Sequence, residues 1–271
     1  MHGYNAKPAL NLLTLKLYHK IYGQGPPVLI LHGLFGSGDN WRTITRFLED
    51  QYTCIVVDLR NHGRSPHDKL MDLLAMSADV LELIDDLRLE KVALIGHSMG
   101  GKVAMYTALT SPESVSHLVV VDIAPRKYAP LHDQVFAAIQ AVEPASMNTR
   151  QEVESLLSDR LNGDLAVVQF LMKNLTRNQD GSLKWKANMP VIMDAYNRLV
   201  DEVSASGVYS GPTLFIRGEQ SDYVSEDDMN DILTLFPLAR LVTIPGAGHW
   251  VHADQPEEMA LGLAHFLGAG Q

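Results

Sequence analysis

A serine stands between two glycines at the end of an apolar segment. Ser98 is the centre of a Gly-x-Ser-x-Gly pattern over residues 96–100, after the apolar run Val92–Ile95 and before residues that favour a helix. In such a turn from strand to helix the serine backbone is strained, and larger side chains two residues away would clash. The following helix directs its free N–H groups and the positive end of its dipole at the same place. The pattern predicts a nucleophilic serine, with the N–H of Met99 beside a developing oxyanion.

A second glycine-rich turn follows an earlier apolar segment. Residues 28–38 run from Val-Leu-Ile-Leu into His-Gly-Leu-Phe-Gly-Ser-Gly. Acyl transfer by a serine needs a second donor to the oxyanion, and losing one such donor costs about 10² to 10³ in rate. We expect the N–H of Leu34 to supply it, with the N–H of Phe35 as a further candidate. The glycine spacing fits neither the dinucleotide-binding nor the Walker A pattern, which argues against a phosphate cradle.

A histidine on a late glycine-rich loop is the expected general base. A serine hydroxyl needs a group that accepts its proton, and imidazole titrates near neutral pH. Of the 11 histidines, His249 follows Gly-Ala-Gly directly after the last predicted strand. We expect four other histidines near these motifs to be structural, namely His32, His62, His97 and His252.

These residues require strands that end near one another. Several short segments are apolar without alternation, as in strands covered on both faces of a parallel sheet. Helical spacing lies between them, clearest in the apolar positions of residues 80–87, which indicates βαβ units. The predicted strands are Leu13–Leu17, Val28–Leu31, Thr53–Val57, Val92–Ile95, Leu118–Val121, Thr213–Ile216 and Leu241–Ile244.

One long segment interrupts the alternation. Between residues 126 and 208 the periodicity is helical, with no convincing strand, and apolar strands precede and follow it. We therefore expect an α/β fold with a mostly parallel central sheet flanked by helices, and a helical cap inserted between two strands. The predicted boundaries are residues 1–125 and 209–271 for the core and 126–208 for the cap.

Composition excludes several other classes of protein. The chain has 271 residues, with 22 Lys and Arg against 32 Asp and Glu, a formal net charge of −10. It lacks the clustered cations that bind nucleic acid or an anionic membrane surface, and no apolar run approaches the roughly 18 residues of a membrane span. The single cysteine, Cys54, permits neither an intramolecular disulfide nor a cysteine-based metal site. We expect a cytoplasmic monomer or homodimer without metal or cofactor.

The order of these motifs resembles the α/β-hydrolase superfamily over nearly the whole chain. Five segments in combination are similar to the small bacterial YbfF-type esterases: residues 32–37, 60–63, 96–102, 121–125 and 246–252. The resemblance implies an α/β-hydrolase fold and a serine carboxylesterase or thioesterase. It also implies a Ser-His-acid triad that works without a cofactor.

Two aspartates are candidates for the acid that orients the histidine. Loss of the triad carboxylate lowers turnover about 10⁴-fold in a serine protease. Many α/β-hydrolases carry Gly-x-x-Asp after the strand that follows the insertion, but here Ser221 takes that position and Asp222 comes one residue late. In the YbfF-type esterases the aspartate matching Asp122 is assigned to the site together with the serine matching Ser221. We expect Asp122 to be the acid and Ser221 its helper, with Asp222 as the alternative.

The substrate pocket is expected to take walls from the loops and the insertion. Candidate apolar walls are Phe35, Trp185, Tyr196 and Trp250. Arg126, beside Lys127 where the insertion begins, is a candidate contact for an anionic leaving group such as coenzyme A.

Together these residues predict a serine carboxylic-ester hydrolase that forms an acyl-enzyme on a small-molecule ester or thioester. A C–C bond hydrolase or a perhydrolase would use the same serine turn. A small-ligand sensor of the same fold with slow hydrolysis is the alternative from a different class, since fold alone does not decide function.

Overall fold

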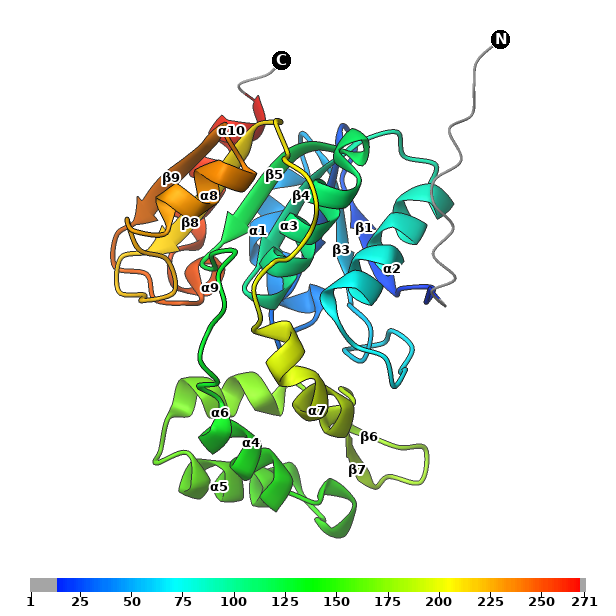
Figure 1. Cartoon of the computed structure of the whole chain (residues 1–271). Coiled ribbons are helices and arrows are strands. Elements are labelled where there is room, and N and C mark those ends of the chain that lie inside the picture. Colours follow the sequence, from blue (N-terminus) through cyan, green and yellow to red (C-terminus); the bar gives the residue numbers. More distant parts are fainter. Residues whose placement is uncertain (1–13, 269–271) are drawn as a thin grey trace.

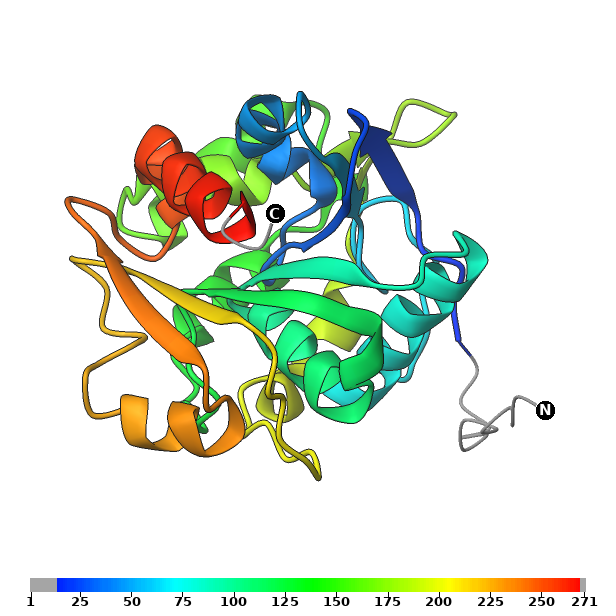
Figure 2. The ribbon, with the colours of Figure 1, turned by 90° about the horizontal axis from the view of Figure 1, so that it is seen from above.

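A seven-stranded sheet forms the centre of the protein (Figures 1 and 2). The computed structural model describes residues 14–268, and its strands are ordered β1-β3-β2-β4-β5-β8-β9. All neighbours pair in parallel except β1 with β3. The strands are β1 His19–Tyr22, β2 Pro27–Leu31, β3 Thr53–Val57, β4 Val92–His97, β5 Val115–Val121, β8 Thr213–Gly218 and β9 Ala239–Ile244. The predicted mostly parallel α/β architecture is confirmed.

Alternate side chains of the strands pack against helices on opposite faces of the sheet. Leu29 and Leu31 of β2 belong to an apolar core with helices α2, α3 and α8, whereas Val28 and Ile30 belong to a second core with α1 and α10. Burial on both faces explains the continuous apolar runs. These helices are α1 Arg42–Leu48, α2 Leu73–Asp86, α3 Met99–Thr110, α8 Met229–Leu235 and α10 Pro256–Gly268, with the shorter η1 Gly38–Trp41, η2 Pro112–Ser114 and α9 Val251–Asp254. Within residues 14–268 no helix combines the length and apolar character that crossing a membrane requires.

Six of the seven predicted strands are present, with ends that differ by up to three residues. The prediction for Leu13–Leu17 is wrong: residues 14–17 form no strand, Leu13 lies outside the described residues, and β1 begins at His19. The apolar residues of this segment dock it onto the core instead. Leu17 is buried there, and the backbone N–H of Leu15 donates to Oδ1 of Asp79 in α2 at 2.7 Å.

The segment between β5 and β8 forms a separate layer at the end of the sheet where β5 ends (Figure 1). We call its helices and hairpin the cap. It contains α4 Asp133–Ala141, η3 Pro144–Ser146, α5 Arg150–Arg160, α6 Leu165–Met172, β6 Leu175–Arg177, β7 Leu183–Trp185 and α7 Met189–Leu199. The expectation of helices alone is wrong, because β6 and β7 pair antiparallel. Each strand has three residues, too few to produce a recognisable alternation. The exact cap boundaries stay a prediction.

The two chain segments that join the cap to the sheet are fastened to each other and to α3. The N–H of Tyr128, on the outgoing segment, donates to the carbonyl of Val200 on the returning one at 2.9 Å. Nζ of Lys102, a buried residue of α3, donates to the carbonyls of Arg126, Val200 and Asp201. One ammonium group therefore holds both joining segments.

Candidate active site

The serine turn has the strained geometry that its sequence predicts. Ser98 follows β4 directly, with φ 52° and ψ −119°, and α3 begins at the next residue. Its N–H donates to the carbonyl of Val121 at 3.0 Å, which holds the turn against the end of β5. A Cβ at Gly96 would lie 2.2 Å from the carbonyl oxygen of Gly100, so a larger residue would clash. The packing of the turn requires the flanking glycine and raises the serine beyond the sheet.

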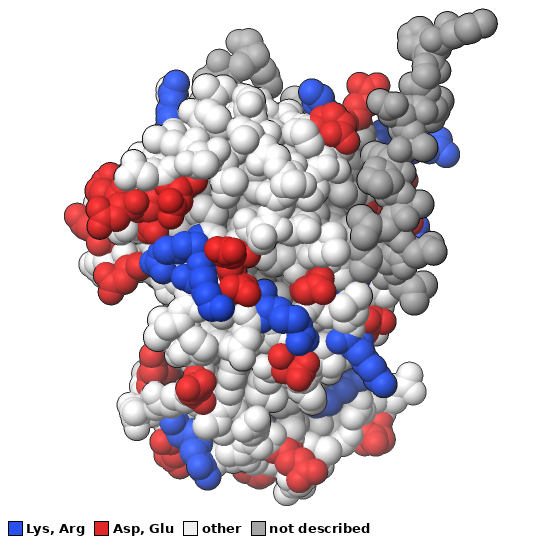
Figure 3. Space-filling view, viewed as in Figure 1, with Lys and Arg blue, Asp and Glu red and all other residues white. Residues whose placement is uncertain are grey.

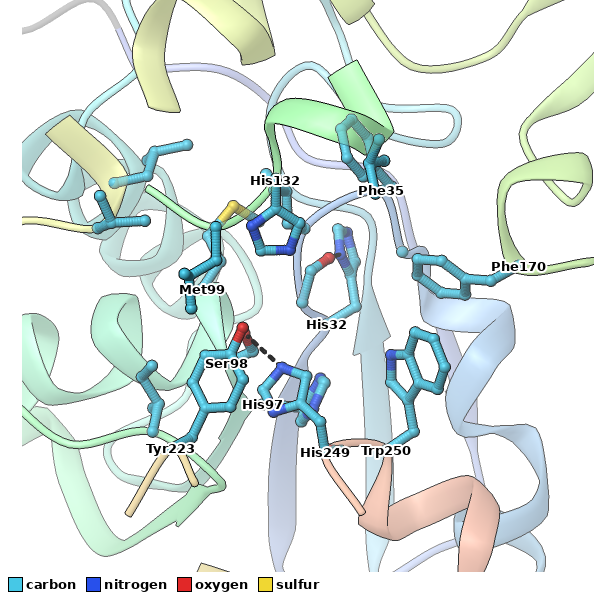
Figure 4. Close-up of a pocket in the computed structure, with 18 of the residues that line it drawn as sticks. His32, Phe35, His97, Ser98, Met99, His132, Phe170, Tyr223, His249 and Trp250 are labelled. Atoms are coloured by element: carbon cyan, nitrogen blue, oxygen red, sulfur yellow. Dashed lines mark hydrogen bonds between the residues drawn. The ribbon is translucent and has the colours of Figure 1, made fainter. Parts of the chain in front are cut away.

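Ser98, His249 and Asp122 form a continuous chain of hydrogen bonds. The Oγ of Ser98 lies 3.1 Å from Nε2 of His249, the contact marked by the dashed line in Figure 4. The Nδ1 of the same ring lies 2.7 Å from Oδ2 of Asp122. A carboxylate only accepts, so Nδ1–H donates to Asp122 and Nε2 is free to accept from the serine hydroxyl. The hydroxyl, imidazole and carboxylate thus lie in the order that the predicted triad requires, and their catalytic roles stay a prediction.

Asp122 is fully buried and its carboxylate is held by several donors. It directly follows β5 with φ 53°, and Oδ1 accepts the N–H of Gly218 at 3.0 Å. Oδ2 accepts the hydroxyl of Ser221 as well as the histidine. Of the two candidate acids, the structure places Asp122 against His249 and leaves Asp222 exposed on the β8–α8 loop. Ser221 lies where the expected helper would be.

One face of the His249 ring also packs against an aromatic side chain. Tyr223 stacks on His249 with ring centroids 3.9 Å apart and planes 20° apart. Nε2–H of His97 donates to the backbone carbonyl of His249 at 2.8 Å. No local pattern marks Tyr223, because the contact joins loops that are 26 residues apart in the chain and depends on how both loops fold.

The glycine-rich loop after β2 passes directly beside the serine. A Cβ at Gly33 would lie 2.7 Å from Nδ1 of His97 and 3.3 Å from Cβ of Ser98. The N–H of Phe35 donates to Nε2 of His62 at 3.2 Å and is therefore occupied. Leu34 thus remains the candidate oxyanion donor in this loop, opposite Met99 at the start of α3.

Two other histidines near the site, His32 and His252, make contacts within the core. Nε2 of His32 accepts the N–H of Leu59 at 3.0 Å, and its Nδ1–H donates to the carbonyl of Gly33 at 2.8 Å. His252 stacks on Trp41 with centroids 4.7 Å apart. Burial lowers the pKa of His32 to about 4 and that of His252 to about 3. Both rings are therefore neutral near pH 7, which fits their packing in the core.

A cavity of about 260 Å³ lies over Ser98, between the core and the cap. Three of the expected wall residues line it: Phe35, Tyr196 and Trp250. Phe170 and His132 of the cap also line it, and sequence reasoning missed both because nothing local marks which face of the cap turns toward the serine (Figure 4). Most of the lining side chains are aliphatic or aromatic, which suits an apolar group.

Two expected pocket residues lie elsewhere. Trp185, in β7, lines a different groove beside the β6–β7 hairpin. Arg126 is not among the described residues that line the cavity. Its Nε donates to Oδ1 of Asp228 at 2.7 Å, and its guanidinium lies 4.0 Å from the ring centroid of Tyr128. Arg126 thus has partners within the protein, and its expected contact with an anionic leaving group stays a prediction.

The basic pair at the start of the cap is neutralised by acidic partners. Lys127 lies 3.2 Å from Asp201, alongside the pair of Arg126 and Asp228. Figure 3 shows Lys and Arg side chains along the boundary between core and cap, with Asp and Glu close to them. Arg126 and Lys127 therefore each already have an acidic partner.

Comparison with known proteins gives the family. A family model described as alpha/beta hydrolase fold matches residues 26–256. The chain belongs to the α/β-hydrolase family. The seven-stranded sheet, the strained serine at the end of β4 and the late histidine loop are thus features of an α/β-hydrolase.

Similar α/β-hydrolases are named as esterases and lipases. "Esterase YbfF" of Escherichia coli (strain K12) is 40% identical over 244 residues, which cover 89% of this chain and 92% of that protein. "sn-1-specific diacylglycerol lipase ABHD11" of Xenopus laevis is 40% identical over 250 residues, or 90% of this chain and 80% of that one. A solved structure, "Marine microorganism esterase", superposes with a TM-score of 0.91 at 41% identity and covers 93% of this chain and all of its own. The chain is therefore an ester hydrolase of the YbfF type.

Proposed function

We propose that this α/β-hydrolase cleaves carboxylic esters through an acyl-enzyme formed on Ser98. The observation that carries the proposal is the contact of 3.1 Å between Ser98 Oγ and Nε2 of His249, whose Nδ1 meets the buried carboxylate of Asp122. The strained serine at the floor of an apolar cavity supports the same role. In this account Ser98 is the nucleophile, His249 the base and Asp122 the acid that orients it.

The reaction proceeds in two halves. Ser98 Oγ attacks the ester carbonyl while its proton passes to Nε2 of His249, and the new oxyanion accepts the N–H groups of Leu34 and Met99. His249 then returns the proton to the leaving alkoxide as the C–O bond breaks. In the second half His249 takes a proton from water, the hydroxide attacks the acyl-enzyme, and Ser98 regains its proton as the acid leaves.

A fluorophosphonate that phosphonylates active serines tests this proposal. Mass spectrometry of the digested protein should find one phosphonyl group on the peptide that contains Ser98, and Ser98→Ala should carry none. A label on another serine would contradict the assignment. Turnover of p-nitrophenyl butyrate over many cycles is expected; a single turnover would favour the ligand sensor instead.

A basic groove beside the cavity favours a phosphorylated leaving group, as in an acyl-CoA thioester. The groove has a volume of about 650 Å³, and Phe35 and Asn40 line both it and the active-site cavity. Its lining contains two acidic residues, Asp39 and Asp58, against six basic ones: Arg64, His67, Lys173, Arg177, Lys184 and Lys186. A leaving group that extends from Ser98 past Phe35 would reach these cations.

The thioester candidate is tested by charge reversal. Lys184→Glu should lower kcat/KM for butyryl-CoA several-fold and leave p-nitrophenyl butyrate almost unchanged, because only the first substrate carries phosphates. Lys91→Glu, a change of equal charge at an exposed residue outside the groove, is the matched control. An equal effect of Lys184→Glu on both substrates would remove the thioester candidate without affecting the ester hydrolase.

A further inference from the structure

A histidine of the cap lines the same cavity as Ser98. His132 immediately precedes α4, and Figure 4 shows its ring among the side chains around the serine. The ring packs against Phe136, with centroids 6.2 Å apart, and against the edge of Tyr196 at 5.1 Å. Two aromatic neighbours therefore fix how the imidazole faces the cavity.

The hydroxyl of Tyr196 determines which nitrogen of His132 carries the proton. This hydroxyl oxygen accepts the N–H of Leu131 at 3.3 Å and is in hydrogen-bond contact with Nδ1 of His132. Burial raises the pKa of Tyr196, so the phenol keeps its proton and needs an acceptor for it. The O–H therefore donates to Nδ1, and the proton of the neutral imidazole lies on Nε2.

The neutral form of His132 is itself favoured. Burial, with a smaller contribution from His249, lowers the pKa of His132. With Nδ1 occupied as an acceptor, Nε2–H is a donor, and no described residue accepts from it. Among the other polar groups of residues that line the cavity, Lys102 donates to three carbonyls and the hydroxyl of Tyr128 donates to the carbonyl of Tyr223, whereas Nε1 of Trp41 and Nδ1 of His252 are buried without a partner among the described residues.

We propose that His132 is a specificity-determining residue whose Nε2–H donates to a second oxygen of the substrate, separate from the ester that is cleaved. The proposal rests on the proposed ester hydrolysis. A pure hydrocarbon substrate would bury this donor without an acceptor, whereas an ether, hydroxyl or second carbonyl oxygen would satisfy it. The preferred class is thus an oxygen-substituted carboxylic ester rather than a simple alkyl ester.

Two pairs of esters of equal length test the proposal on either side of the reacting carbonyl. The acyl pair is p-nitrophenyl 3-methoxypropanoate against p-nitrophenyl pentanoate, and the alcohol pair is 2-methoxyethyl butanoate against butyl butanoate. Each kcat/KM is divided by the rate constant for alkaline hydrolysis of the same ester, which removes intrinsic reactivity. One hydrogen bond in the cavity should favour the ether by about 3- to 10-fold in at least one pair. An unmodified enzyme with no preference in either pair would overturn the proposal.

Variants at position 132 separate the donor from the shape of the ring. His132→Phe should bring the preferred ratio close to one, whereas His132→Gln, which keeps an N–H near the position of Nε2, should retain most of it. A ratio in His132→Phe equal to that of the unmodified enzyme would contradict the proposal.

Tyr196→Phe is a second test of the donor, which remains available if His132→Phe does not fold. Tyr196→Phe removes the donor to Nδ1, so the proton is no longer fixed on Nε2, and the ratio should fall at least about twofold. An unchanged ratio would again contradict the proposal. If the unmodified enzyme hydrolyses none of the four esters, the result would instead contradict the proposed ester hydrolysis.

Discussion

The imidazole of His249 lies face to face with the phenol ring of Tyr223, with centroids 3.9 Å apart. Tyr223 follows Ser221 by two residues, and its N–H donates to the Ser221 hydroxyl oxygen at 3.3 Å. Ser221 in turn donates to Asp122. The loop after β8 therefore contacts both the histidine and its carboxylate, and so links the positions of the two.

Replacing Tyr223 should slow catalysis without weakening substrate binding. An aromatic face stabilises the imidazolium that forms as Ser98 loses its proton, by about 0.5 to 2 kcal/mol. Tyr223→Leu should lower kcat about 2- to 30-fold with little change in KM, and Tyr223→Phe, which keeps the face, should stay within about twofold of the unmodified enzyme. Steady-state kinetics on one ester measures both. Equal losses in the Leu and Phe variants would show that the hydroxyl, not the ring face, matters.

The two aspartates are distinguished by conservative replacement. Asp122→Asn removes the charge that holds His249, and kcat should fall about 10³- to 10⁴-fold. Asp222→Asn should stay within about twofold, because Asp222 is exposed and the histidine is bonded elsewhere. A collapse of activity in Asp222→Asn alone would reverse the assignment of the acid.

Gly33→Ala should disturb the oxyanion loop. The added Cβ would lie 2.7 Å from Nδ1 of His97 and 3.3 Å from Cβ of Ser98, so the loop must move away from the serine. Displacing the N–H of Leu34 removes one oxyanion donor, and kcat should fall about 10²-fold while KM changes less. Thermal unfolding of the variant checks that the core remains intact. Undiminished kcat in a folded variant would place the donor elsewhere.

Lys102 makes stability depend on pH in a predictable direction. Burial lowers its pKa from 10.5 to about 7, so between these values the unfolded chain binds more protons than the folded one. Stability contributed by this group therefore rises with pH across that window. In urea unfolding, the free energy of the unmodified protein relative to Lys102→Met should increase between pH 7 and pH 9.5, by up to about 3 kcal/mol. A difference that stays constant over this window would show that the three carbonyls outweigh burial and keep the ammonium charged.

Local sequence was sufficient to predict the serine turn and the glycine-rich loop before His249. Ser98 needs a strained φ and small neighbours, and the histidine loop needs glycines for its turn, so both patterns are visible over a few residues. The buried strands were also predictable, because burial on both faces leaves a continuous apolar run.

Contacts between distant segments could not be predicted in this way. Tyr223 and His132 gain their places from the packing of the β8–α8 loop and of the cap, and neither carries a local pattern. No local pattern indicates that Arg126 pairs with Asp228, which lies 102 residues later in the chain. Leu15 and Leu17 gave the apolar pattern of a strand because the segment packs on α2, a tertiary reason that periodicity does not distinguish.

The central claim is that Ser98 attacks the ester. The most direct measurement is the kcat of Ser98→Ala on p-nitrophenyl butyrate, with the fold of the variant confirmed by circular dichroism. If Ser98 is the nucleophile, kcat should fall about 10⁶-fold, the scale for loss of the nucleophile in a serine protease. A folded Ser98→Ala that retains kcat within about tenfold of the unmodified enzyme would show that another group attacks the ester.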